Sequence, residues 1–183
     1  RHSPIDLGKE TLFRRVVMPE FEEHPQDRVV TTRAGFRMRL RTDDFIQRYV
    51  YAFGVWEPNL SNWLAETLRP GDVFVDVGAN VGYFSLLASR LVGPAGRVVA
   101  IEASAGNHRI LTEQLALNQA DNVRTVHAAV ADERGRLCLY RDPDGNLGLT
   151  STSPEGGLVP ESEVDCYPLQ DLLQPDEIER QRH

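Results

Sequence analysis

The 183-residue sequence has few cysteines, a single lysine and no long apolar run. Cys138 and Cys166 stand far apart and belong to no Cys-x-x-Cys or Cys/His cluster, which excludes a structural zinc site with its four or so closely spaced ligands. Two such thiols are typical of a reduced, cytoplasmic protein. No stretch approaches the ~18 consecutive apolar residues of a membrane span. The charged first thirty residues contain no secretory signal either.

The chain also has fewer basic than acidic residues. The chain has 20 Lys and Arg against 27 Asp and Glu, a formal net charge of −7. Nucleic-acid binders usually carry a basic surplus, so we do not expect nucleic acid as a partner. Arg33, Arg37, Arg39 and Arg41 form the one basic cluster. We interpret them as a solvated strand face, and a phosphate-bearing substrate is the alternative.

What remains is an ordinary globular composition, with 41% hydrophobic and 26% charged residues. Residues 1–70 predict short elements that do not repeat. In order, these are a helix that ends at Pro19, a β-hairpin over 28–40, a helix capped by Asp43 or Asp44 that ends at Gly54, and a helix capped by Ser61.

From residue 71 onward, strands and helices alternate. We expect strands at 73–77, 97–102 and 123–130, separated by helices at 83–92 and 104–118. Short apolar strands of this kind are typical of a parallel sheet that is buried on both faces, so the pattern predicts an α/β unit with right-handed crossovers. After Asp132 the alternation stops, and a β-hairpin with an intervening loop over 142–162 follows.

One segment carries ligand-binding chemistry: Asp76–Ser85, which reads Asp-Val-Gly-Ala-Asn-Val-Gly-Tyr-Phe-Ser. A glycine-containing turn between a buried strand and a helix presents backbone N–H groups to a ligand at the carboxyl edge of the sheet. Glu102 ends the next strand, near the ~20-residue offset at which an acidic side chain meets ribose hydroxyls. These features predict a site for an adenosine-containing ligand. The alternative is a tight turn followed by a solvated glutamate.

The loop differs from the dinucleotide fingerprint Gly-x-Gly-x-x-Gly at two positions. Asn80 stands where the second glycine lets a pyrophosphate approach the backbone, and Gly82 comes one position early. The carboxylate of Asp76 would repel a pyrophosphate but suits a ligand that carries an ammonium group. S-adenosylmethionine has such a group, a ribose for Glu102 and no phosphate. The loop therefore favours this cofactor, and an NAD(P)-dependent Rossmann oxidoreductase is the alternative.

The run from Gly71 to Ser85 resembles the first motif of the FkbM family of S-adenosylmethionine-dependent methyltransferases, and the resemblance covers about residues 45–173. The further matches, in the family's order, are the Gly-x-x-Glu-Pro turn within Phe53–Pro58, then Asn118, 121–123, 128–130 and 169–173. The sequence departs from the family pattern at Ala103, Ala105 and Gln114, on the helix that follows Glu102.

This resemblance implies a Rossmann-like class I methyltransferase fold of three α/β/α layers, with S-adenosylmethionine as cofactor. Asp76, Gly78, Asn80 and Gly82 would face the methionine half of the cofactor. Glu102 would hold the ribose diol. No metal ion is implied.

Three further residues complete the implied cofactor site. Ala128 and Ala129, in the loop after the third strand, would border the adenine, and Glu57 would close over the cofactor from the amino-terminal side. An exposed glutamate before a proline turn is the alternative for Glu57. No catalytic base is identified. His127 lies at a strand end, where a structural histidine is more common than a catalytic one.

The reaction implied is O-methylation of a hydroxyl on a small molecule, sugar or secondary metabolite. The family's acidic motif on its next core strand does not occur before His183, so we expect a sheet truncated after the third core strand and a following hairpin. Residues 1–70 would be accessory helices and a hairpin, and 71–183 the cofactor-binding part of the methyltransferase domain. A truncated, non-catalytic methyltransferase-like module is a further alternative. The loop over 142–162 would lie near the acceptor.

Overall fold

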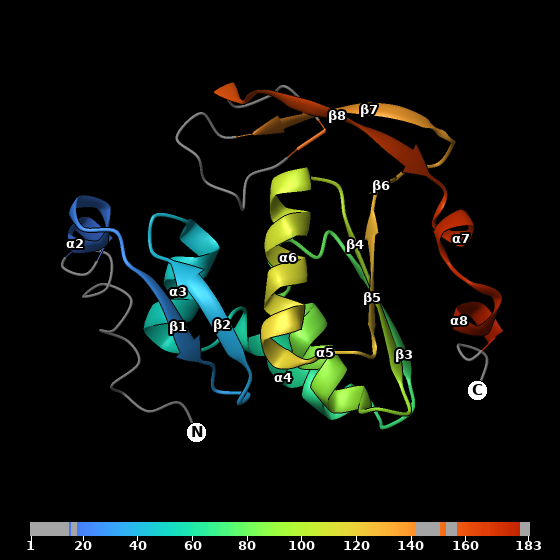
Figure 1. Ribbon diagram of the computed structural model, residues 1–183, viewed down its shortest axis with the longest axis horizontal. Helices are drawn as coiled ribbons and strands as arrows, with labels where there is room; N and C mark the ends of the chain where they lie inside the picture. The colour runs from blue at the N-terminus through green and yellow to red at the C-terminus, as the bar shows by residue number, and fades with distance from the viewer. Residues whose placement is uncertain (1–14, 16–17, 142–150, 153–156, 180–183) are drawn as a thin grey trace.

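The computed structural model describes residues 15, 18–141, 151–152 and 157–179 (Figure 1). The amino-terminal elements are α2 (Met18–Glu23), β1 (Asp27–Thr31), β2 (Arg37–Arg41), α3 (Phe45–Phe53) and α4 (Pro58–Thr67). The central elements are β3 (Val73–Val77), α5 (Tyr83–Val92), β4 (Arg97–Glu102), α6 (Ala105–Asn118), β5 (Val123–His127) and β6 (Ala129–Val130). The last are β7 (Gly135–Arg141), β8 (Val159–Tyr167), α7 (Leu169–Leu172) and α8 (Pro175–Glu179).

The amino-terminal hairpin is confirmed, whereas one helix start was wrong. β1 and β2 pair antiparallel, and α3 is capped by the Asp44 side chain and ends at Gly54 in a left-handed conformation. Pro19 lies in the first turn of α2, where proline lacks only an N–H that the first turn leaves unbonded. Most of the helix expected before Pro19 lies outside the described residues. Ser61 lies inside α4, which begins at Pro58 with Glu57 as its cap residue. The hydroxyl of Ser61 donates to the Trp56 carbonyl.

A three-stranded parallel sheet in the order β3-β4-β5 forms the centre of the molecule. Figure 1 shows it nearly edge-on, with α5 and α6 on one side and the short helices α7 and α8 on the other. The expected α/β unit is confirmed. β4 is the middle strand, and five of its six residues are buried, which explains its unbroken apolar run Val98–Ile101.

The third strand is shorter than expected, because the chain changes sheets after His127. Ala129 and Val130 form β6, which pairs with β8 in a second sheet of order β6-β8-β7. β7 and β8 pair antiparallel, so the expected hairpin is present. It lies across the carboxyl ends of the parallel strands (Figure 1).

The amino-terminal elements and the central unit share one hydrophobic core. Phe36, Met38 and Leu40 on or beside β2 pack in the same buried cluster as Leu86 of α5 and Leu111 of α6. The Phe36 ring also meets Tyr83 edge-to-face at 5.3 Å between centroids. Side chains alternate between the two faces of β2, so Met38 and Leu40 point into this core while Arg37, Arg39 and Arg41 are exposed on the other face.

The carboxyl-terminal helices are held by a buried ion pair. The guanidinium of Arg124 on β5 donates to both carboxylate oxygens of Glu177, whose side chain is fully buried, and to the Leu172 carbonyl. Glu177 also accepts from the backbone N–H of Gln174. α8 is thereby fixed against the strand that leads into the candidate site.

Candidate functional site

A pocket of about 300 Å³ lies at the carboxyl ends of β3 and β4. Its polar end is formed by Gly78, Asn80 and Glu102, and its wall continues through Ala103 and Asn107 at the start of α6. The other lining residues are Val77, Ile101, Ala128, Ala129, Val130, Leu139, Ser151 and Thr152. The pocket thus joins a polar end to a largely apolar slot, which suits a ligand with a sugar at one end and a flat ring at the other.

The loop after β3 owes its shape to left-handed backbone angles. Gly78 has φ +76°, and no atom lies within 4 Å of where a β-carbon would stand, so its backbone is open to the pocket. Gly82 has φ +90°, and a β-carbon there would meet Leu111 Cδ1 at 2.6 Å. The two glycines serve different needs: Gly78 leaves room for a ligand, and Gly82 lets α5 begin against α6. Asn80 is also left-handed, with φ +49°.

Glu102 is 5% exposed and is held by backbone donors. Its Oε2 accepts from Asn80 N at 2.7 Å, and its Oε1 accepts from Ser104 N at 2.8 Å. Burial raises the pKa of Glu102, and the hydrogen bonds from Ser104, Asn80 and Asn107 act against that rise.

Asp76 is buried on β3, directly before the loop, and its Oδ2 accepts from the Ser85 hydroxyl at 2.6 Å. Burial raises the pKa of this carboxyl despite the hydrogen bond, and the nearby negative charge of Glu102 raises it further. An ammonium group placed here would favour the ionised form of Asp76. The site therefore combines two buried carboxylates behind one glycine-containing loop.

The structure brings together most of the residues predicted from the sequence. Five of them line the pocket: Gly78, Asn80, Glu102, Ala128 and Ala129. Asp76 and Gly82 flank it through the strand and the loop.

Glu57 lies apart from the pocket lining, exposed in the turn between α3 and α4. It has φ +40°, while Gly54 ends α3 with φ +70° and Pro58 opens α4. The Gly-x-x-Glu-Pro pattern therefore corresponds to the turn that joins α3 to α4. The role of Glu57 over the cofactor stays a prediction.

Several pocket residues were missed in the sequence. Asn107 follows the N-cap Ser104 by three positions, which is an ordinary helix-start pattern and gave no ligand signal. Leu139 comes from β7, and Ser151 pairs with Tyr140 through two backbone hydrogen bonds of 2.8 and 2.9 Å. Ser151 and Thr152 belong to the loop that we expected near the acceptor, and most of that loop lies outside the described residues.

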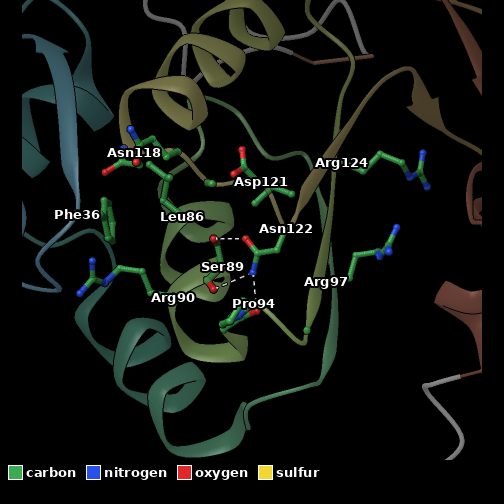
Figure 2. Close-up of a pocket in the computed structure, with 15 residues that line it drawn as sticks. Phe36, Leu86, Ser89, Arg90, Pro94, Arg97, Asn118, Asp121, Asn122 and Arg124 are labelled. Carbon is green, nitrogen blue, oxygen red and sulfur yellow. Dashed lines mark hydrogen bonds between the residues drawn. The ribbon is translucent and has the colours of Figure 1, made fainter.

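Two larger hollows lie away from this pocket. One, of about 620 Å³, is at the amino ends of β4 and β5. It contains Asn122, which holds the end of α5 through Ser89 and the Gly93 carbonyl (Figure 2). These bonds are structural and leave no obvious reactive group.

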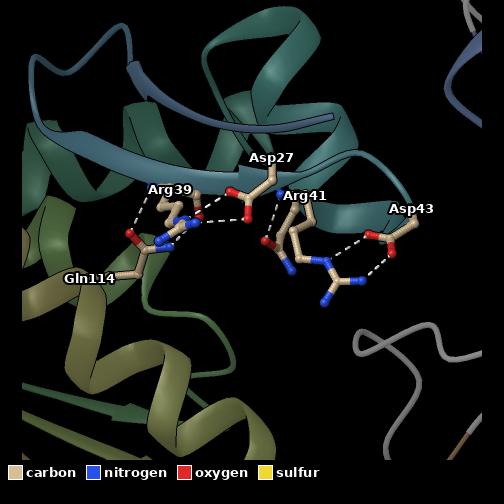
Figure 3. A network of polar contacts seen from close by, with 6 residues as sticks. Asp27, Arg39, Arg41, Asp43 and Gln114 are labelled. Atoms are coloured by element: carbon tan, nitrogen blue, oxygen red, sulfur yellow. Dashed lines mark hydrogen bonds and ion pairs between the residues drawn. The ribbon is translucent and has the colours of Figure 1, made fainter. Parts of the chain in front are cut away.

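The other hollow, of about 680 Å³, lies between the hairpin and α6 and includes part of the predicted arginine cluster. Arg39 forms an ion pair with Asp27, and Arg41 forms one with Asp43 (Figure 3). The Arg37 guanidinium donates to the Leu117 carbonyl, and Arg33 lies in the turn after β1. The strand face is solvated, as interpreted, and much of its positive charge is already neutralised.

His127 is exposed and bonded to the Ala103 carbonyl at 3.0 Å. Its ring lies 5.2 Å from that of His108, and burial lowers the pKa of His108, as does His127 itself. This environment agrees with a structural role. Within the described part of the chain, no helix has the length and apolar character needed to cross a bilayer.

Comparison with known proteins gives a consistent result. The sequence model of the methyltransferase FkbM domain matches residues 76–181. A protein-L-isoaspartate O-methyltransferase from Triticum aestivum is 32% identical over 91 residues, which cover 50% of this chain and 36% of the relative. The methyltransferase sdnD from Sordaria araneosa is 35% identical over 94 residues, covering 51% and 33%. The chain therefore spans about a third of the length of these curated relatives.

Among solved structures, TYW2 from P. horikoshii in complex with MeSAdo matches with 21% identity and a TM-score of 0.43, covering 57% of this chain and 37% of that one.

Proposed function

Because the chain belongs to the methyltransferase FkbM domain family, we propose that the pocket at the carboxyl ends of β3 and β4 is its S-adenosylmethionine site. The family match excludes the nicotinamide alternative raised by the glycine-containing loop. S-adenosylmethionine supplies a methyl group on a positively charged sulfur. Everything else at the site is a matter of how this chain binds, orients and shields the reactants.

The residues present fit the cofactor. Glu102 lines the pocket with a carboxylate that can accept from a ribose diol, and the open face of Gly78 leaves space beside it. Asp76 supplies negative charge for an ammonium group. Ala128 and Ala129 line the apolar slot, where a purine ring would lose little hydration.

We further propose that the acceptor is a hydroxyl of a small molecule or sugar. Relatives include a protein methyltransferase by name, so the acceptor has to be argued from this chain. Its net charge of −7 is unfavourable for an RNA backbone, and two of the three exposed arginines of β2, Arg39 and Arg41, are paired with carboxylates. Cys138 and Cys166 are free thiols, which supports the expected cytoplasmic setting.

The observation that carries the proposal is the buried Glu102 carboxylate, fixed by two backbone N–H groups at the end of β4 and open to the pocket. Isothermal titration with S-adenosylhomocysteine and, separately, NADH tests it. We expect binding of the first only, and Glu102→Gln should weaken it about tenfold through the loss of charge-assisted hydrogen bonds. Glu113→Gln, on the exposed face of α6, is the matched control. Binding of NADH alone would contradict the proposal.

A further inference from the structure

Ser104 connects two carboxylates that are far apart in the sequence. Its backbone N–H donates to Glu102 Oε1 at 2.8 Å, and its hydroxyl donates to Glu161 Oε1 at 2.9 Å. Ser104 is 1% exposed and Glu102 is 5% exposed, so the bond between them is buried, whereas the bond to Glu161 is part-buried. Glu161 lies on β8, 57 residues further along the chain.

The direction of these bonds fixes the orientation of Ser104. A serine hydroxyl has one proton, and the carboxylate of Glu161 can only accept it. The hydroxyl oxygen is then left to accept from Asn107 N, which caps the first turn of α6. The same residue thus holds the helix start with its side chain and the pocket carboxylate with its backbone. Loss of Glu161 would leave the hydroxyl free to rotate.

The contact with Ser104 is the one that Glu161 makes at this junction. Its Oε2 is buried and has no hydrogen-bond partner among the described residues. Among the residues that the structure describes, shortening the Glu161 side chain therefore removes the hydrogen bond to Ser104 and no second one. Glu163, two positions along β8, is exposed and forms an ion pair with Arg136, which makes it a suitable control.

The β7–β8 hairpin touches the pocket at a second point. β8 pairs with β6 through Ala129↔Cys166 and Val130↔Tyr167, and both β6 residues line the apolar slot. The hairpin is therefore fastened at the predicted adenine end by backbone pairing and near the ribose end by Glu161. Figure 1 shows β8 passing over the start of α6 and reaching β6.

We propose that Glu161 is a positioning residue: by holding Ser104, it sets the geometry with which Glu102 binds the ribose diol. This inference rests on the proposed function, because it assumes that Glu102 meets the ribose. Glu161 itself is not among the residues that line the pocket. The β7–β8 hairpin thereby tunes cofactor affinity from outside the glycine-containing loop.

The test is a titration of the full chain with S-adenosylhomocysteine and with its 2′,3′-dideoxy analogue. Glu161→Ala should weaken binding of the first ligand about fivefold, the equivalent of one ordinary hydrogen bond. It should leave the second unchanged, because that ligand has no diol. Glu161→Gln keeps an acceptor oxygen and should restore most of the affinity, whereas Glu163→Ala should have no effect. In a Ser104→Ala background, Glu161→Ala should add nothing.

Failure of the inference and failure of the proposed function give different results. If the wild-type chain binds S-adenosylhomocysteine but Glu161→Ala weakens both ligands equally or neither, Glu161 has only a structural role and the inference is wrong. If the wild-type chain binds neither ligand, the proposed function is wrong and the inference falls with it. Thermal unfolding of each variant shows whether it is folded at the titration temperature.

Discussion

Asp76 illustrates how a binding residue can oppose folding. It is buried beside two neutral donors, the hydroxyl and the backbone N–H of Ser85, and no cation is bonded to it among the described residues. A buried carboxylate in this setting is disfavoured in its charged form, which is why its pKa is raised. The cofactor's ammonium group would supply the missing positive charge. Residues of this kind contribute affinity at the expense of stability.

Asp76→Asn should therefore stabilise the free protein while weakening cofactor binding. The folded-state pKa is above the unfolded value, so stability from this group is present at acidic pH and is lost as the pH rises through the folded pKa. At neutral pH we expect the variant to gain about 1 kcal/mol in the free energy of unfolding. Urea denaturation at about pH 5 and pH 8 measures both the gain and its pH dependence. A variant less stable than wild type at pH 8 would show that Asp76 is structural.

At the scale of elements, the strand–loop–helix unit β3–α5 depends on close approach to α6. Gly82 begins α5 with φ +90°, and the place of its missing β-carbon is filled by the Leu111 side chain at 2.6 Å. The conformation alone disfavours other residues, and the neighbouring helix adds a steric reason. Gly71 offers a comparison, because it has φ +94° with no atom within 4 Å of a β-carbon.

Gly82→Ala should lower the free energy of unfolding by about 3 kcal/mol, since strain and overpacking add. Gly71→Ala carries the backbone strain alone and should cost roughly 1 kcal/mol. Chemical denaturation of the two variants measures the difference between their losses in the free energy of unfolding. This difference is the cost of the contact with Leu111. Equal losses would mean that α6 moves aside at no cost.

The element boundaries that the sequence predicted well are those set by local chemistry. Ser104 was predicted as a cap and Gly54 as a helix end, and the cap before Phe45 was narrowed to Asp43 or Asp44, of which the structure has Asp44, because each acts on its own neighbours. β3 and β4 were found from continuous apolar runs. The end of β5 was missed, since the switch of Ala129 to the second sheet depends on β8, more than thirty residues later.

At the scale of the whole molecule, two amides of α6 bind the edge of β2. Gln114 accepts from Arg39 N at 2.9 Å and donates to Arg39 O at 2.6 Å, and Asn118 bonds Arg37 N and O in the same way at 2.8 and 2.6 Å (Figure 3 shows Gln114). Gln114 and Asn118 are four residues apart on α6, a rise of about 6 Å, and their partners on β2 are two residues apart, a rise of about 6.7 Å. The two spacings therefore match. The amides replace a neighbouring strand and join the amino-terminal segment to the predicted cofactor unit.

Gln114→Ala leaves the N–H and carbonyl of Arg39 without these partners in a partly buried position. We expect the free energy of unfolding to fall by about 2 kcal/mol. Glu113→Ala, next along the helix, removes only an exposed i,i+4 ion pair with Arg109 and should change it by less than about 0.5 kcal/mol. Urea denaturation compares the two. A similar effect of both variants would show that the amide contacts add nothing.

Long-range contacts explain what sequence reasoning left out. Five of the eight predicted site residues line one pocket, because parallel strands bring their carboxyl ends to the same edge. The pairs Ser104–Glu161 and Arg39–Gln114 could not be predicted, because their members lie 57 and 75 residues apart and no local pattern links them. Glu57 was chosen from a motif, and the structure shows a helix corner at that position.

The central claim is that the Glu102 carboxylate binds the ribose of S-adenosylmethionine. A crystal structure of the chain with S-adenosylhomocysteine tests it most directly. The account predicts both ribose hydroxyls within about 3 Å of the Glu102 carboxylate, with the adenine between Ala128 and Leu139. A ligand bound elsewhere, or a ribose turned away from Glu102 in this pocket, would contradict it.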